Sequence, residues 1–319
     1  MKPAAKTKDA PPVLSVVTPA YNEAINLPLM YARLCEVLDP LARWEWIVID
    51  DHSADETFAV ADELAHKDER VRCVRFSRNF GSHRAILCGL ERMRGECAVV
   101  MAADLQDPPE VVPQLLEKWK EGVKVVWAVR SKRENMGAGA LLMSRFYYFM
   151  MRRFVGLKNM PAEGADFMLI DRRVAQALGQ FPEKNFSVFA MITWMGFPQA
   201  GVIYDKKARQ HGKSGWSLEQ KLKLALDSMI SFSYMPMRLI SGLGFLSAVA
   251  GALWLALQFC APYAPDLSEG WTKFAAALLI VSGLQWMMMG VLGEYLWRAL
   301  DEARRRPRFI IERSTEEEP

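Results

Sequence analysis

The chain has 319 residues, of which 51% are hydrophobic and 11% aromatic, and its formal net charge at pH 7 is +3. This composition excludes a disordered protein, and the small charge without a dense basic stripe argues against nucleic acid as a partner. The five cysteines form no CxxC pair and no even-numbered framework. They indicate core residues in a reduced compartment rather than a disulfide scaffold or a zinc site.

Residues 1–12 carry lysines and prolines but no apolar run, so they predict a disordered N-terminus rather than a signal peptide. A folded domain is predicted over residues 13–216, in the cytoplasm. Its strands are expected at residues 13–18, 46–49, 71–76, 98–101 and 123–129, and its helices at 27–38, 57–64, 82–92 and 109–121. These repeated βα units predict an α/β, Rossmann-type domain with a mostly parallel sheet, helices on both faces and a ligand site at the carboxyl ends of the strands.

Polar side chains follow the predicted strands directly. They are Asp50, Asp51, Arg78, Asn79, Asp104, Gln106 and Arg130. The glycine-rich GxGxxG and GxxxxGK[ST] motifs are absent from the sequence, so the patterns that usually hold dinucleotides and triphosphates are excluded. A nucleotide would have to be held in another way.

The most informative segment is VVMAADLQDPPE, residues 99–110. The Asp104 carboxylate and the Gln106 amide oxygen follow a buried strand two residues apart, and both are ligands suited to a hard divalent cation. Magnesium fills its remaining positions with water and substrate phosphates, so few protein ligands imply a phosphorylated substrate. Asp107 is also expected to cap a helix that begins at Pro108 and Pro109.

This segment resembles DxDLQxPPE of the dolichyl-phosphate mannose synthase type within glycosyltransferase family 2, which includes bacterial polyprenyl-phosphate glycosyltransferases with two C-terminal membrane helices. Four further segments match in order: VTPAYNE (17–23), VIDDHSADET (48–57), FSRNFG (76–81) and RQHGKSGW (209–216). Together the matches cover roughly residues 13 to 300. The resemblance implies a GT-A-like fold and transfer of a sugar from a nucleotide.

Site residues follow from this resemblance, position by position. Nucleotide-binding residues would be Pro19, Tyr21, Glu23, Asp51, Arg78 and Asp104, with Asp51 bonded to the base. Asp104 and Gln106 would hold Mg²⁺ or Mn²⁺, and Arg130 would meet a phosphate, for which the planar guanidinium is well suited. The first aspartate of DxD is Ala102 here, which removes one acidic ligand and favours, as an alternative, a non-catalytic membrane scaffold derived from such an enzyme.

The reaction implied is a direct displacement with inversion at the anomeric carbon. Asp166 matches an acidic position near the acceptor, and it would orient a lipid phosphate that is already mostly ionised. The segment 209–216 would form a lid in which Arg209, Lys213 and Ser214 donate to phosphates and Gly212 permits the turn. Arg130 and Arg209 would neutralise the departing diphosphate.

The C-terminal third predicts membrane association. Residues 217–238 form an amphipathic juxtamembrane pattern, residues 239–259 and 274–297 are membrane-span candidates, 260–273 is an external loop and 298–319 a cytoplasmic tail. The arginines after the second span predict a multi-pass protein of the inner membrane with both termini in the cytoplasm. Glycines that could support a homo-oligomer are Gly242, Gly244, Gly251, Gly283 and Gly290.

The function that the resemblance favours is an inverting transfer of a hexose from UDP-glucose to undecaprenyl phosphate, a polyprenyl phosphate. GDP-mannose and a UDP-linked modified pentose are alternative donors. A processive polysaccharide synthase would need a QxxRW motif and more spans, and the sequence contains neither.

Overall fold

The structure is a computed structural model that describes residues 12–131, 167–181, 183, 187–206, 242, 245, 246, 249 and 267–315. The chain divides into two compact units. One comprises Met1–Ala225 together with Pro307–Pro319, and the other comprises Leu226–Arg306. The first unit contains the sheet and all residues of the site described below.

The first four strands form the parallel part of the sheet, as the sequence predicts. They are β1 (Leu14–Ala20), β2 (Trp44–Asp50), β3 (Val71–Phe76) and β4 (Cys97–Val100). β1 lies between β2 and β4, and β3 pairs with the other edge of β2, all in parallel register. Every residue of β2 is buried, which is expected of a parallel strand covered on both faces.

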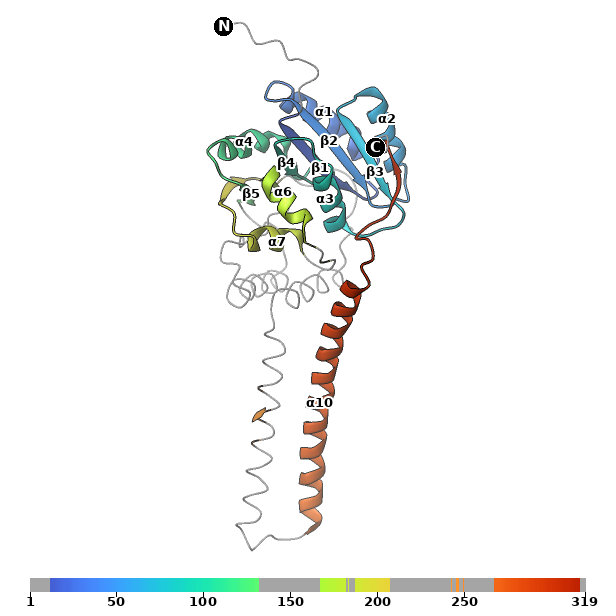
Figure 1. Ribbon diagram of the computed structural model, residues 1–319, viewed down its shortest axis with the longest axis vertical. Helices are drawn as coiled ribbons and strands as arrows, with labels where there is room; N and C mark the ends of the chain where they lie inside the picture. Colours follow the sequence, from blue (N-terminus) through green and yellow to red (C-terminus); the bar gives the residue numbers. More distant parts are fainter. Residues whose placement is uncertain are drawn as a thin grey trace. The chain divides into compact units, whose positions relative to one another are not determined.

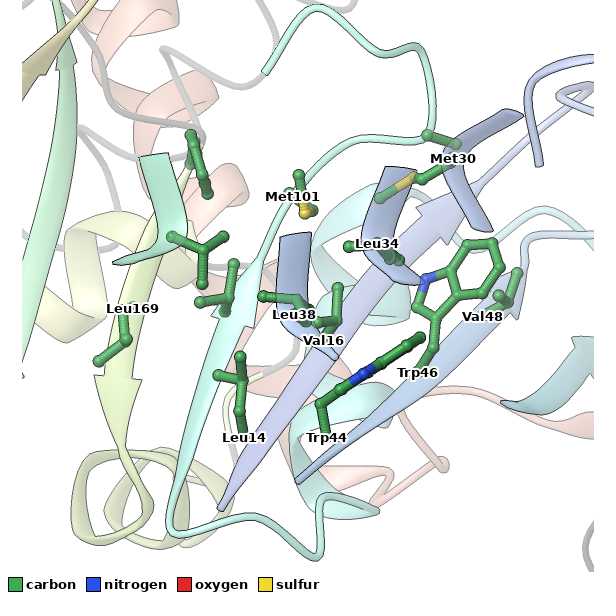
Figure 2. Packing of buried hydrophobic residues seen from close by; sticks show 14 of the residues in the cluster. Leu14, Val16, Met30, Leu34, Leu38, Trp44, Trp46, Val48, Met101 and Leu169 are labelled. Atoms are coloured by element: carbon green, nitrogen blue, oxygen red, sulfur yellow. The ribbon is translucent and has the colours of Figure 1, made fainter. Parts of the chain in front are cut away.

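Helices cover both faces of this sheet because the chain reverses its direction across it. α1 (Asn26–Leu38) and α2 (Thr57–Lys67) pack on one face, where Leu34 and Leu38 join Val16 and Trp46 in the main core (Figures 1 and 2). α3 (Ser82–Glu91) connects β3 back to β4 on the other side of β1, and it packs on the opposite face. Right-handed crossovers in opposite directions place their helices on opposite faces of a sheet.

The second half of the sheet is mixed. β5 (Val125–Arg130) pairs in parallel with β7 (Gln199–Tyr204), whereas β6 (Met168–Asp171) lies antiparallel between β4 and β5. The 3₁₀ helix η1 (Pro109–Val111) leads into α4 (Val112–Lys120), and α6 (Arg172–Gly179) and α7 (Val188–Trp194) complete the described elements of this half. The strand order is β7-β5-β6-β4-β1-β2-β3-β8. The alternation of βα units predicts none of β6, β7 or β8.

The last strand, β8 (Ile311–Ser314), pairs antiparallel with β3 at one end of the sheet. The Ser77 N–H donates to the Ile310 carbonyl at 3.0 Å, and the Thr315 N–H donates to the Cys73 carbonyl at 2.9 Å. β8 lies within the segment that the sequence pattern indicates as a tail. It covers the backbone edge that β3 would otherwise expose.

The second unit contains α10 (Leu267–Ala303), a helix of 37 residues. Within the described residues, the structure has no helix that is both long and apolar enough to cross a membrane. The prediction of two spans in a multi-pass protein of the inner membrane is therefore wrong on this evidence. The predicted span of residues 274–297 contains polar Ser282 and Gln285 and the charged Glu294, which lower its apolar character. Most of residues 239–259 lies outside the described residues.

The glycines named as packing sites have open surroundings where they are described. At Gly242, Gly283 and Gly290, no heavy atom lies within 4 Å of the position that a Cβ would take. Gly244 and Gly251 lie outside the described residues. A homo-oligomer thus stays a prediction.

Candidate functional site

The carboxyl ends of β1 and β4 diverge, and this geometry forms the base of the site. β4 pairs with β1 only as far as Val100 opposite Val17, whereas β1 continues alongside β2 to Ala20 opposite Asp50. From β1 the chain continues to β2 on one side, and from β4 it continues to β5 on the other side. In open α/β sheets, ligands bind in the crevice at such a switch point.

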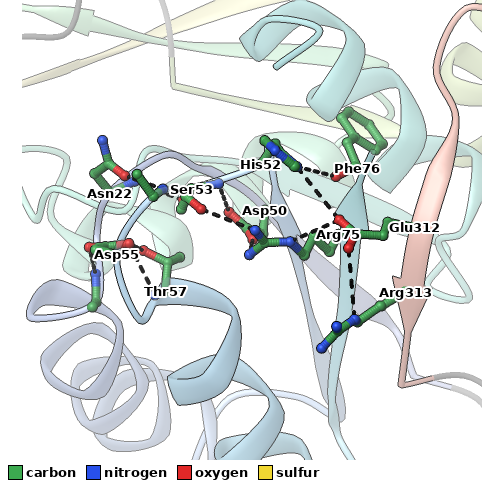
Figure 3. A network of polar contacts seen from close by, with 12 residues as sticks. Asn22, Asp50, His52, Ser53, Asp55, Thr57, Arg75, Phe76, Glu312 and Arg313 are labelled. Atoms are coloured by element: carbon green, nitrogen blue, oxygen red, sulfur yellow. Dashed lines mark hydrogen bonds and ion pairs between the residues drawn. The ribbon is translucent and has the colours of Figure 1, made fainter. Parts of the chain in front are cut away.

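The loops after β1 and β2 are fastened to each other by side chains (Figure 3). The Asn22 N–H donates to the Ser53 hydroxyl at 2.9 Å, and the Ala54 N–H donates to the Asn22 side-chain oxygen at 2.9 Å. The Glu23 N–H donates to the Thr57 hydroxyl at 2.8 Å. These bonds hold the expected nucleoside-binding segment against the Asp51 loop. Tyr21 remains 46% exposed beside them, so its ring is accessible to a base.

Asp51 is buried and connects the loop after β2 to the loop after β3. One carboxylate oxygen accepts the Phe80 N–H at 2.6 Å, and the other accepts the Gly81 N–H at 2.8 Å. Burial raises the pKa of the Asp51 carboxyl to about 6, an effect that these two backbone hydrogen bonds oppose. Gly81 has φ +95°, a conformation that favours glycine. Asp51 thus organises the start of α3, beyond the base contact expected of it.

Three residues other than glycine adopt a positive φ at these strand ends. They are Asn22 at 58°, His52 at 60° and Leu105 at 58°, which follow β1, β2 and β4 respectively. A left-handed conformation is unfavourable for a bulky residue such as leucine, and such strain tends to gather at binding and catalytic sites. The strain therefore supports a functional role for this edge of the sheet.

Asp104 and Gln106 lie in the loop after β4 and are the residues proposed for the metal. Asp104 is only 5% exposed, and one of its carboxylate oxygens accepts the Gln106 N–H at 3.2 Å. Across the described residues, no group of three or more His, Cys, Asp or Glu side chains could hold a metal ion. Oxygen donors fit Mg²⁺ or Mn²⁺, but a cation here would need substrate phosphates and water to complete its ligands.

Asp107 has a different role from the helix cap that the sequence predicts. η1 has no side-chain cap, and the Asp107 carboxylate instead accepts the Tyr204 hydroxyl at 2.6 Å and pairs with the Lys206 ammonium at 3.2 Å. Burial and the Asp107 charge raise the pKa of Tyr204, and a hydrogen bond from Arg130 opposes them. Arg130 is opposite Tyr204 in the β5–β7 pairing. The loop that carries Asp104 and Gln106 is therefore joined to Arg130 through the end of β7.

The structure places the other predicted residues as follows. Pro19 is opposite Ile49 near the end of β1, and Arg78 lies on the surface with its guanidinium over the Phe80 ring at 4.1 Å. Asp166, Arg209, Gly212, Lys213 and Ser214 lie outside the described residues.

Sequence patterns do not predict several residues of the site. Tyr204 ends β7 and Lys206 follows it, and the patterns do not predict this strand. Asn22 and Thr57 do carry a usable signal, because Asn and Thr side chains commonly bond nearby backbone in loops.

Comparison with known proteins agrees with this geometry. The chain is 35% identical to the uncharacterized glycosyltransferase YkcC of Bacillus subtilis, over 94% of this chain and 93% of the relative. It is 32% identical to the prophage bactoprenol glucosyl transferase homolog of Escherichia coli, over 94% and 98%. Glucosyl-3-phosphoglycerate synthase of Mycobacterium tuberculosis, crystallised with Mn²⁺, UDP and its product, has a similar fold at a TM-score of 0.51 and 17% identity, with 69% and 78% coverage.

The family assignment follows from these sequence matches. Residues 15–179 match glycosyl transferase family 2, and this match spans β1 to the end of α6. The α/β sheet is the GT-A-like nucleotide-binding fold that the resemblance implies. The chain belongs to glycosyl transferase family 2 and is a glycosyltransferase.

Proposed function

We propose that this enzyme transfers a sugar from a nucleoside diphosphate sugar, with UDP-glucose favoured, to the phosphate of a polyprenyl lipid such as undecaprenyl phosphate. The product would be a polyprenyl monophosphate sugar with inverted anomeric configuration. The observation that carries the proposal is the similarity to a bactoprenol glucosyl transferase homolog along nearly the whole of both chains. A relation limited to the nucleotide-binding half would say nothing about the acceptor.

The donor would bind over the carboxyl ends of β1, β2 and β4. The exposed ring of Tyr21 offers a face to the base, and Pro19 and Glu23 border the same loop. Each Asp51 oxygen already accepts one backbone N–H, and each retains a further lone pair for a donor on the base. Arg78 is exposed beside this loop and is available to the nucleotide.

The diphosphate would lie between the Asp104 loop and Arg130. A divalent cation held by Asp104 and Gln106 would neutralise charge on the departing nucleotide. The Asp107–Tyr204 hydrogen bond fixes the loop that carries both ligands to the strand end that faces Arg130. Arg209, Lys213 and Ser214 would close over the phosphates, with Gly212 as the turn.

The acceptor needs little activation. Phosphate monoesters lose their second proton near pH ~6, so the attacking oxygen already carries charge at neutral pH. Asp166 would orient the acceptor phosphate rather than abstract a proton. Most of the barrier would then lie in stabilising the leaving diphosphate, which suits a site with an arginine and a metal.

The decisive experiment is a transfer assay with purified full-length protein, undecaprenyl phosphate, Mg²⁺ or Mn²⁺, and radiolabelled UDP-glucose, GDP-mannose and a UDP-pentose offered separately. We expect label from UDP-glucose in the lipid fraction, and we expect EDTA to stop the transfer. Transfer from another donor alone would change the donor assignment. Binding of nucleotide sugar without label in the lipid from any donor would reject the acceptor.

A further inference from the structure

A continuous line of polar contacts joins the C-terminal strand to the loop after β1 (Figure 3). The Arg75 Nε lies 3.1 Å from a Glu312 carboxylate oxygen, and Nη1 lies 2.8 Å from an Asp50 oxygen. Asp50 accepts the Ser53 N–H with its other oxygen at 2.9 Å, and the Ser53 hydroxyl accepts the Asn22 N–H. The contacts run from β8 through the ends of β3 and β2 to the loop after β1.

Arg75 holds the central position because it binds three groups at once. Besides the two carboxylates, its Nη2 donates to the Ser53 carbonyl at 3.1 Å. Asp50 is fully buried, so its charge requires this partner. The guanidinium is planar, and Glu312 at Nε fixes the rotation of the plane that presents the other nitrogens to Asp50 and Ser53. Glu312 thereby acts on the loop after β2 through Arg75.

Glu312 has a second link to the same loop. A Glu312 oxygen lies 3.6 Å from His52 Nδ1, which is itself 3.1 Å from the Phe76 carbonyl. His52 is the residue directly after Asp51, and it has a positive φ. A contact that restrains the His52 side chain also restrains the backbone that orients Asp51.

An apolar connection runs parallel to the polar one. The Phe309 ring stacks on Phe76 with centroids 5.1 Å apart, and Phe76 meets Phe80 edge to face at 5.5 Å. Phe80 donates its N–H to Asp51. Residues 309–315, which we call the C-terminal buttress, therefore contact both loops that meet at Asp51.

We propose that Glu312 is a positioning residue, which from its place in the C-terminal buttress fixes the loop of residues 51–57 for the nucleotide of the donor. The inference rests on the proposed function, because it takes the nucleotide to lie at Asp51. Glu312 touches no part of the nucleotide in this scheme. Its effect is to lower the mobility of the loop before binding, which strengthens binding without adding a contact.

The test compares Glu312→Gln with Arg313→Gln, a matched change on the next residue of the strand. Arg313 is 66% exposed, and its Nε lies 3.9 Å from Glu312, so its loss should matter little. Calorimetry with UDP and with GDP, each with Mn²⁺, measures nucleotide affinity without an acceptor. Hydrogen exchange measures the mobility of residues 51–57 without any ligand. Glu312→Gln should weaken binding about tenfold and speed exchange in this loop, whereas Arg313→Gln should change neither.

The outcomes separate this inference from the proposed function. Unchanged affinity or unchanged exchange in a folded Glu312→Gln protein would overturn the positioning role, and faster exchange with unchanged affinity would assign Glu312 a purely structural role. Glu312→Asp should restore part of the affinity. Failure of lipid transfer with intact, Glu312-dependent nucleotide binding would reject only the acceptor. If Glu312→Gln does not fold, Phe309→Leu perturbs the same buttress through the apolar connection and is judged by the same two measurements.

Discussion

At the scale of single residues, Asp51 links protonation to stability. Its folded-state pKa of about 6 lies above ~3.9, the value for an exposed aspartate. Its protonated form therefore adds stability that is fully present below about pH 4 and is lost as the pH rises through 6. Relative to Asp51→Asn, the free energy of unfolding of the unmodified protein should fall by roughly 2–3 kcal/mol between pH 4 and pH 7.

The measurement is denaturant unfolding of both proteins across this pH range. A constant offset is also expected. Asparagine has a single oxygen in place of the two that accept from Phe80 and Gly81, and its amide nitrogen is a donor that cannot replace the second acceptor. A difference between the two proteins that does not vary with pH would show that Asp51 titrates normally.

Asp104 is expected to control turnover rather than folding. Asp104→Asn keeps the shape of the side chain and an oxygen that can accept the Gln106 N–H, but it removes the negative charge that would hold a cation. Transfer should fall on the order of 100-fold or more, while the thermal midpoint changes little. Excess Mn²⁺ should restore part of the rate if the loss lies in metal affinity. A rate equal to that of the unmodified enzyme would exclude Asp104 from the metal site.

At the scale of elements, the packing of α3 on β1 depends on a glycine. A Cβ at Gly89 would lie 2.3 Å from Val17 Cγ1, so a side chain there requires the helix or the strand to move. Alanine favours a helix by up to ~1 kcal/mol over glycine, but overpacking typically costs about 1–3 kcal/mol. Gly89→Ala should therefore destabilise the protein in chemical unfolding.

A second substitution tests the cause. Val17→Ala removes the clashing methyl groups, so the double variant should be more stable than the sum of the two single changes. Gly179→Ala, where among the described residues a Cβ would meet only the Glu91 side chain at 4.0 Å, is a matched helical control without a clash. If the losses of stability from Gly89→Ala and Val17→Ala are additive, the new side chain on α3 does not clash with β1.

Sequence patterns predict the first half of this fold well because each βα unit is local. Helix periodicity and buried β-branched runs locate β1 to β5 within a few residues, and the carboxyl ends of these strands bring Asp51 and Asp104 to one edge. β6 and β7 are harder to predict, because a short antiparallel strand such as β6 gains its stability from neighbours distant in sequence. Among the described strands, β7 pairs only with β5, about 70 residues earlier in the chain, so no local pattern marks Tyr204.

At the scale of the whole molecule, the C-terminal segment returns to the sheet that the N-terminus begins. β8 is short, with Glu312 and Arg313 at its centre, so no apolar alternation marks it as a strand. Its partners are Arg75 and Phe76 on β3, more than 200 residues earlier in the chain. β8 is recognised as a strand only from its pairing with β3. The composition of the segment alone indicates a solvated tail.

Truncation after residue 306 tests whether β8 is required for the stability of the sheet. The truncated chain loses the Phe309–Phe76 stack and the Glu312–Arg75 ion pair and exposes the edge of β3, so its unfolding free energy should fall by roughly 2–4 kcal/mol. A synthetic peptide of residues 307–319 should raise the thermal midpoint again by pairing with β3 in trans. The same peptide with Phe309→Ala and Glu312→Gln should not. An unchanged thermal midpoint after truncation would show that β8 does not contribute to the stability of the other seven strands.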